Sequence, residues 1–164
     1  MFDKLKSKVG ALVVVGALSG LGLGGCDVNH SCTLVAVHSG ALLTLHLPPE
    51  ADVVAPETAT VCREPDCVTG TIPPLAPAGT IAPMSFSSND VQGTLDGAAG
   101  GVRVLRIDWT VPNVNPADPR NAYMLDVIDS AGTTTGHLAG EVTYVESMPN
   151  GDGCGTVWNA SLSD

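Results

Sequence analysis

The chain has 164 residues and a formal net charge of −10, with 7 lysines and arginines against 17 carboxylates. Its length suits one domain behind a short leader rather than several domains. The shortage of cations argues against nucleic acid or anionic lipid as a partner, because both are bound through clustered positive charge.

The first 25 residues have the pattern of an export signal. Lys4, Lys6 and Lys8 form a short cationic stretch, and the 17 residues from Val9 to Gly25 carry no charge. This order of basic and then apolar residues is typical of a signal peptide. The apolar run is shorter than the roughly 20 residues that span a bilayer comfortably, and a permanent span is the alternative that remains open.

The end of this segment carries a more specific pattern. Leu23-Gly24-Gly25-Cys26 resembles the lipobox of bacterial lipoproteins. The resemblance implies cleavage between Gly25 and Cys26 and attachment of a diacylglyceryl group to the Cys26 thiol. Two acyl chains hold a protein stably on a membrane, whereas a single chain holds it only marginally. The alternative is an ordinary signal peptide cleaved nearby, which would leave Cys26 as a free thiol.

This pattern predicts three segments and a location. Residues 1–25 are the cleaved lipoprotein signal peptide, residues 26–31 are the lipidated tether, and residues 32–164 are the folded domain. Cleavage removes every lysine and leaves four arginines against 16 carboxylates, a formal charge of −12. The expected location is the cell membrane, with the protein facing outside the cytoplasm at the cell surface or in the periplasm. The expected partners are the membrane, through the lipid on Cys26, and an unidentified envelope protein or polysaccharide.

The folded part has the sequence of an all-β domain. Runs rich in Val, Ile, Leu and Thr are bounded by Gly, Pro, Asn and Asp, and no stretch of a dozen residues shows an uninterrupted helical stripe. The predicted strands are Cys32–Val37, Ala41–Leu47, Thr58–Cys62, Cys67–Ile72, Gly101–Val111, Tyr123–Asp129, Glu141–Ser147 and Thr156–Leu162. Strands of this number and spacing favour an immunoglobulin-like β-sandwich of about seven to nine strands.

The strand over Gly101–Val111 alternates most regularly. Arg103, Leu105, Ile107, Trp109 and Val111 share one face, which predicts a half-buried strand with Trp109 in the core.

Three segments are predicted to be loops, namely residues 48–57, 73–83 and 113–121. The first two hold seven of the twelve prolines, and each proline lacks a donor for a sheet ladder.

The four cysteines after Cys26 form an even set, and export would place them where disulfides persist. Cys62 and Cys67 bracket a four-residue turn, so in a regular hairpin they lie opposite one another, close enough for a disulfide. Cys32 and Cys154 would then join the first and last strands. Four cysteines allow three pairings, and the other two remain alternatives.

No metal, cofactor or catalytic site is predicted. His30, Cys32, Cys62 and Cys67 are zinc-type ligands, but their spacing is a loose fit to known zinc sites. The chain lacks the common hydrolase, protease and phosphate-binding motifs. Asp108, Asp126 and Glu141 lie in or beside predicted strands and could pair across a sheet as an acid and a base, although a solvated sheet face explains them equally well.

The last third of the chain resembles a group of small, mostly uncharacterised β-rich lipoproteins of high-GC Gram-positive bacteria. The similarity rests on "GEVTYVESMPNGDGCGTVWNASL", residues 140–162, together with the cysteine-bearing hairpin. It implies a disulfide-stapled sandwich displayed at the cell surface and brings no catalytic residues. The sequence therefore predicts a membrane-anchored binding or envelope-interaction module of unknown ligand. The alternative is a secreted enzyme, or an enzyme inhibitor, with its site in the Pro-rich loops.

Overall fold

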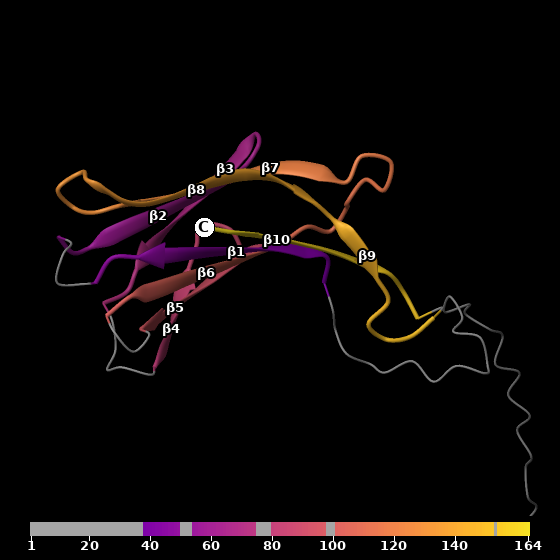
Figure 1. Ribbon diagram of the computed structural model, residues 1–164, viewed down its shortest axis with the longest axis horizontal. Helices are drawn as coiled ribbons and strands as arrows, with labels where there is room; N and C mark the ends of the chain where they lie inside the picture. The colour runs from indigo at the N-terminus through magenta and orange to yellow at the C-terminus, as the bar shows by residue number, and fades with distance from the viewer. Residues whose placement is uncertain (1–37, 50–53, 75–79, 98–100, 153) are drawn as a thin grey trace, which may run out of the picture.

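The computed structural model describes residues 38–49, 54–74, 80–97, 101–152 and 154–164. The signal peptide, the tether, Cys26, Cys32 and the predicted strand Cys32–Val37 lie outside these residues. The described chain is all-β (Figure 1). Its strands are β1 (Gly40–Leu47), β2 (Glu57–Arg63), β3 (Asp66–Ile72), β4 (Ile81–Ser85), β5 (Val91–Gly97), β6 (Arg103–Thr110), β7 (Arg120–Ile128), β8 (Thr134–Thr143), β9 (Val145–Ser147) and β10 (Val157–Ser163).

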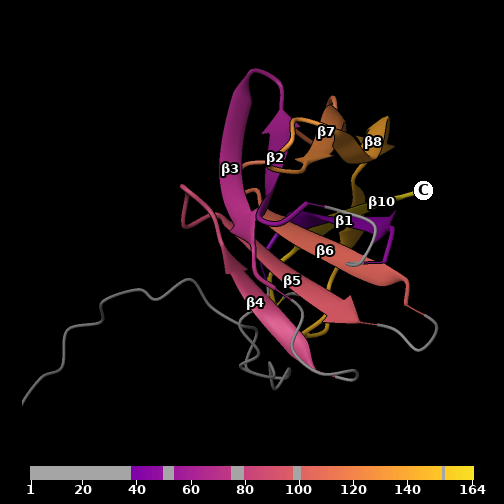
Figure 2. The same cartoon turned by 90° about the vertical axis from the view of Figure 1, so that its left-hand side faces the viewer.

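The strands form two sheets that pack against each other (Figure 2). The six-stranded sheet has the order β4-β5-β6-β1-β10-β9, and the four-stranded sheet has the order β3-β2-β7-β8. All neighbours are antiparallel except β1 and β10, which run parallel at the centre of the larger sheet. The all-β prediction is confirmed, but the expected seven to nine strands were too few, since ten lie in the described residues alone.

The two sheets are connected along both sides. On one side β8 and β9 follow each other through Tyr144, so that the chain leaves the smaller sheet and enters the larger one (Figure 1). On the other side Phe86 bridges to Gly70, which brings the edge strand β3 next to the segment after β4. Tyr144 is buried at this crossover and its hydroxyl lies 2.5 Å from that of Tyr123.

The core fills the space between the sheets with alternate side chains of both. On β6 the residues Leu105, Ile107 and Trp109 are buried, and Arg106 and Asp108 point outward. The predicted face of this strand, with Trp109 in the core, is confirmed. Trp109 packs edge-on against Tyr123 of the opposite sheet, with ring centroids 6.0 Å apart, an arrangement that aromatic pairs favour.

Arg103 shares the buried face of β6 and meets an acidic partner there. Its guanidinium donates to both carboxylate oxygens of Glu57, and Nε donates to Pro48 O at 2.6 Å. Thr135 Oγ1 donates to Glu57 Oε1 at 2.7 Å. Arg103 is 2% exposed and Glu57 is 3% exposed. Charges removed from water need such complete pairing, because a lone buried ion is costly.

All three predicted loops were partly wrong. Residues 73–83 were expected to be irregular, yet β4 begins at Ile81 and contains Pro83. A proline fits there because β4 is an edge strand, where a residue can lack a ladder donor. Residues 48–57 were expected to be a loop, but Glu57 opens β2, and the predicted loop 113–121 ends in the first two residues of β7.

Candidate functional site

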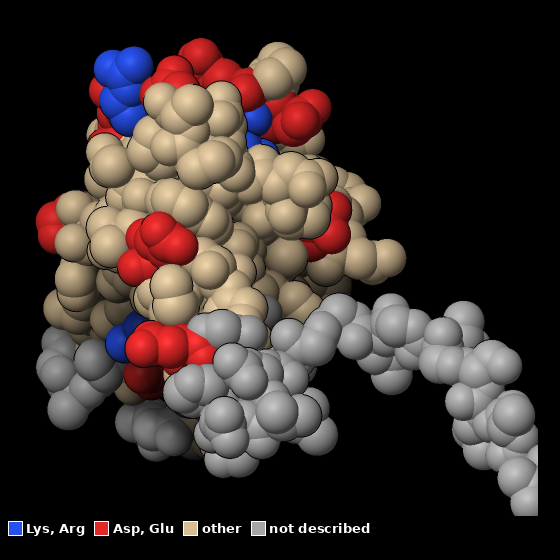
Figure 3. Space-filling model, turned by 90° about the vertical axis from the view of Figure 1, so that its right-hand side faces the viewer, with Lys and Arg blue, Asp and Glu red and all other residues tan. Residues whose placement is uncertain are grey.

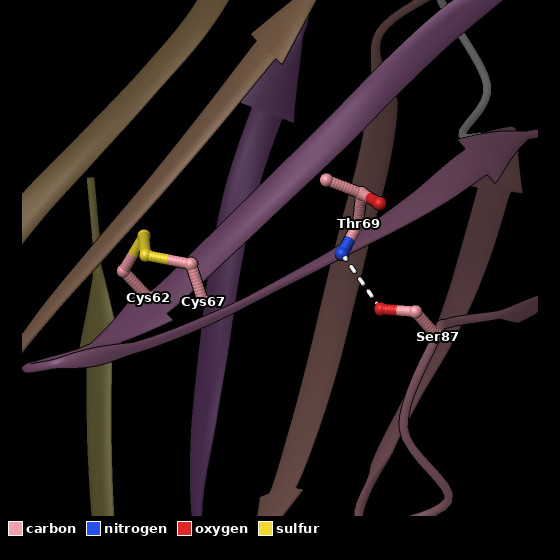
Figure 4. Close-up of a disulfide and its surroundings, with 4 residues drawn as sticks. All are labelled: Cys62, Cys67, Thr69 and Ser87. Atoms are coloured by element: carbon pink, nitrogen blue, oxygen red, sulfur yellow. Dashed lines mark hydrogen bonds between the residues drawn. A yellow bond between two sulfur atoms is a disulfide. The ribbon is translucent and has the colours of Figure 1, made fainter.

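The cysteine hairpin is the first predicted site that the structure describes. Cys62 and Cys67 are opposed in the β2–β3 register and joined by a disulfide, with their α-carbons 4.0 Å apart (Figure 4). The strands extend to Arg63 and Asp66, so the connecting turn has two residues rather than the four predicted. Beyond the disulfide, Ser87 Oγ accepts from Thr69 N at 3.3 Å, which ties β3 to the corner of the larger sheet.

The structure describes only one of the two cysteines of the second predicted disulfide. Cys154 is disulfide-bonded, and Cys32, its predicted partner, lies outside the described residues. The Cys32–Cys154 pairing therefore stays a prediction. The same holds for Gly25 and Cys26 as cleavage and lipid sites, and for His30 as a possible metal ligand.

The predicted acid–base candidates do not converge. Asp108 is exposed on the outer face of the six-stranded sheet, whereas Asp126 and Glu141 lie on the outer face of the four-stranded sheet. Asp126 is opposite His137 and Glu141 is opposite Ala122, so these two carboxylates are four register positions apart. Asp126 is paired there with His137, whose Nδ1 lies 2.6 Å from Asp126 Oδ1. Because the core separates the two outer faces, Asp108 and Asp126 cannot act on one substrate atom.

The Pro-rich segments meet at one end of the domain, around the buried ion pair. A hollow of about 290 Å³ opens there, and its lining residues are Ala55, Pro56, Glu57, Ile72, Pro73, Pro74 and Arg103. Its carboxylate, Glu57, already binds Arg103 and Thr135. Within the described residues this hollow therefore has a satisfied ion pair and an otherwise apolar lining.

The largest described hollow lies elsewhere, on the outer face of the six-stranded sheet. It has a volume of about 550 Å³, and its lining residues are Leu42, Pro83, Met84, Ser85, Phe86, Ser88, Asn89, Val91, Gln92, Gly93, Thr94, Arg106 and Asp108. A second hollow of about 470 Å³ adjoins it, lined by His38, Gly40, Leu42, Asp108, Thr143, Val145, Asn159, Ala160 and Ser161. Leu42 and Asp108 line both hollows, so we treat them as one groove, called here the outer groove.

The strand register explains why these side chains lie together. Ser85 is opposite Gln92, Gln92 is opposite Asp108, Asp108 is opposite Leu42, and Leu42 is opposite Ser161. These five residues form one row across β4, β5, β6, β1 and β10, named here the central row. Neighbouring strands are about 4.8 Å apart, so the central row is about 19 Å long.

The charges of the outer groove are unevenly compensated. Arg106 Nη1 lies 3.6 Å from Asp96 Oδ2, and both side chains are partly exposed. Asp108 makes no hydrogen bond or ion pair with any part of the chain that the structure describes. On the face drawn in Figure 3 carboxylates likewise outnumber cationic groups, and wide areas carry no charge. The outer groove thus offers a free carboxylate among amide and hydroxyl side chains.

The sequence indicates Asp108 only as a possible acid or base and does not identify its neighbours in the central row. Their signal was present in Val91–Gly97, where Val91, Gly93 and Leu95 alternate with Gln92, Thr94 and Asp96. Gly93 obscured this alternation, because a glycine contributes nothing to a hydrophobic pattern.

Comparison with known families, with curated proteins and with solved structures finds no match to this chain. Among the described residues there is no helix suited to crossing a membrane, and no cluster of three or more His, Cys, Asp or Glu side chains that could hold a metal ion.

Proposed function

We propose that this protein is a lipid-anchored binding module of the cell envelope, tethered through Cys26 and facing outside the cytoplasm. The domain would be an immunoglobulin-like sandwich behind a signal peptide over residues 1–25, and the outer groove would be its binding surface. The observation that carries the proposal is the central row, where the side chains of Ser85, Gln92, Asp108 and Ser161 have no hydrogen-bonding partner within the described residues.

The shape of the outer groove supports binding rather than catalysis. Both hollows are open, and their described lining includes one carboxylate, Asp108, and one histidine, His38, whose side chains share no hydrogen bond. A catalytic acid or base must be held within hydrogen-bond reach of the reacting atom, whereas a binding surface needs complementary polar groups over a wider area.

The lipid anchor supports the proposed location and has a direct test. Cells that express the full chain are grown with an alkyne-bearing fatty acid, and the protein is purified and checked for the label. Wild-type protein is expected to be labelled, because the lipobox places an acylated thiol at Cys26. The Cys26→Ala variant is expected to lose the label.

Cys32→Ala is the matched control, since it also replaces a cysteine, six residues further on, and keeps the lipobox. It is expected to be labelled like wild type. Because Cys32 is the predicted partner of Cys154, the label is measured per amount of protein recovered. Unlabelled wild-type protein, or a Cys26→Ala variant labelled as strongly as wild type, would contradict the anchor.

A further inference from the structure

The outer groove crosses the strands instead of following an edge, and this direction restricts what can bind in it. Inside the sheet, the backbone groups of β5, β6 and β1 are used in the ladders on both sides. A ligand lying along the central row can therefore be recognised only through side chains. A peptide that extends a sheet needs free backbone groups of an edge strand, and within the central row only Ser85, at its end, belongs to an edge strand.

The side chains of the central row form a chain of hydrogen-bonding groups. Gln92 offers both an amide donor and an acceptor, Ser85 and Ser161 offer hydroxyls, and Asp108 accepts only. Leu42, which is 43% exposed, places an apolar surface among them. A complementary ligand is about 19 Å long, carries groups that donate and accept along its length, and has an apolar patch of C–H groups.

The charges in and around the outer groove further restrict the class of ligand that can bind. The arginine of the outer groove is balanced by Asp96, while Asp108 at the middle of the central row has no described partner. The mature chain also carries a formal charge of −12. A polyanion would meet like charge both at the groove and over the whole domain, and like-charge contacts suppress binding.

We propose that the outer groove binds a polysaccharide strand that carries no negative charge, lying along the central row with its hydroxyl groups on Gln92 and Asp108. This inference rests on the proposed function of an envelope binding module and names the ligand class. Sugar hydroxyls both donate and accept, which matches the mixed side chains, and a pyranose ring presents C–H groups to Leu42. Asp108 sets the specificity, since it accepts from hydroxyls and repels carboxylates.

The test compares three neutral oligosaccharides with an anionic one. Purified full-length lipidated protein in detergent is titrated calorimetrically with neutral β-linked oligomers of N-acetylglucosamine, glucose and mannose. Hyaluronan oligomers, in which a carboxylate sugar alternates with N-acetylglucosamine, are the anionic counterpart. At least one neutral oligomer is expected to bind, and hyaluronan oligomers are expected to bind at least tenfold more weakly or not at all.

Variants then locate the site. Asp108→Asn is expected to weaken the binding of the neutral oligomer at least tenfold, and Leu42→Arg is expected to abolish it by filling the groove. Both side chains are exposed, so the fold should be retained, which circular dichroism checks. Asp126→Asn, with the same change of charge on the opposite sheet, is expected to bind like wild type.

The inference is overturned if none of the neutral oligomers binds. It is also overturned if neither Asp108→Asn nor Leu42→Arg changes the binding, or if hyaluronan oligomers bind as tightly as the neutral ones. Preferential binding of a lysine-rich peptide in place of the sugars would also overturn it. Fatty-acid labelling is independent of these titrations. A protein that is labelled but binds no sugar would therefore contradict the proposed ligand class and leave the proposed lipid anchor standing.

Discussion

The ion pair between Arg103 and Glu57 shows how a polar residue can occupy a core position. The alternation of β6 predicted that Arg103 lies on the buried face, and it does. The sequence could not identify Glu57 as its partner, because 46 residues separate the two and Glu57 belonged to a predicted loop. Long-range pairing of this kind depends on strand order, which local patterns do not contain.

Removing one member of this pair should be costly. Glu57→Gln leaves the charge of Arg103 buried without a counterion, and breaking a buried pair in this way costs about 3–5 kcal/mol. Urea denaturation should show that loss of unfolding free energy. The matched control is Asp96→Asn, which removes the partly exposed partner of Arg106 and should cost about 0–1 kcal/mol. Equal losses of unfolding free energy in the two variants would show that burial does not determine how costly it is to break each ion pair.

Tyr123 and Tyr144 offer a spectroscopic probe of the core, because they are the two tyrosines of the chain. Burial and then the hydrogen bond to Tyr144 raise the pKa of Tyr123. Burial also raises the pKa of Tyr144, although its contacts with Tyr123 and Arg63 oppose this. Both phenols are therefore expected to stay protonated in the folded protein above the pH at which free tyrosine ionises, about 10.

An alkaline titration followed by ultraviolet absorbance tests this expectation. The unfolded chain loses its phenolic protons above about pH 10 while the folded chain keeps them, so stability is present below that pH and falls as pH rises. Phenolate absorbance should appear only together with unfolding, whereas protein in urea should titrate near pH 10. Reversible ionisation near pH 10 in a folded protein would contradict the burial of this pair.

At the scale of elements, six predicted strands correspond closely to observed ones and two strands were missed. β4 and β5 were missed because Pro83, Gly93 and Gly97 dilute their hydrophobic pattern. Glu141–Ser147 was predicted as one strand, but the chain changes sheets at Tyr144 and forms β8 and β9 there. Three of the five residues of the central row, Leu42, Asp108 and Ser161, lie in strands that the sequence predicts. That they lie side by side depends on strand register, which is set by tertiary structure.

The corner where β3 meets the larger sheet depends on close packing at Gly70. A β-carbon at Gly70 would lie 2.9 Å from both Ser85 O and Phe86 Cδ1. Gly70→Ala should therefore push the corner apart and cost about 1–3 kcal/mol, the range for overpacking. Thr71→Ala, at the exposed neighbouring position of β3, should change stability far less. Thermal denaturation of both variants measures the difference, and an unchanged melting temperature for Gly70→Ala would show that the corner is not tightly packed.

At the scale of the whole molecule, the disulfides are expected to constrain the chain over very different lengths. On the chain-entropy model the hairpin link at Cys62–Cys67 contributes about 2 kcal/mol, and the predicted link between Cys32 and Cys154 about 4–5 kcal/mol. Intact mass measured with and without reductant should differ by the hydrogens of two disulfides. Cys154→Ala should destabilise the domain more than Cys67→Ala. A mass shift corresponding to one disulfide would contradict the predicted pairing.

The parallel pairing of β1 with β10 also bears on when the domain can fold. β1, the first strand of the described residues, lies beside β10, the last, with Gly40 opposite Asn159, and β10 also pairs with β9. Contacts so distant in sequence form late and slowly. If the chain crosses a membrane from its N-terminus, as we propose, the larger sheet stays incomplete until Val157–Ser163 has crossed, and the topology would then delay folding until the end of transport.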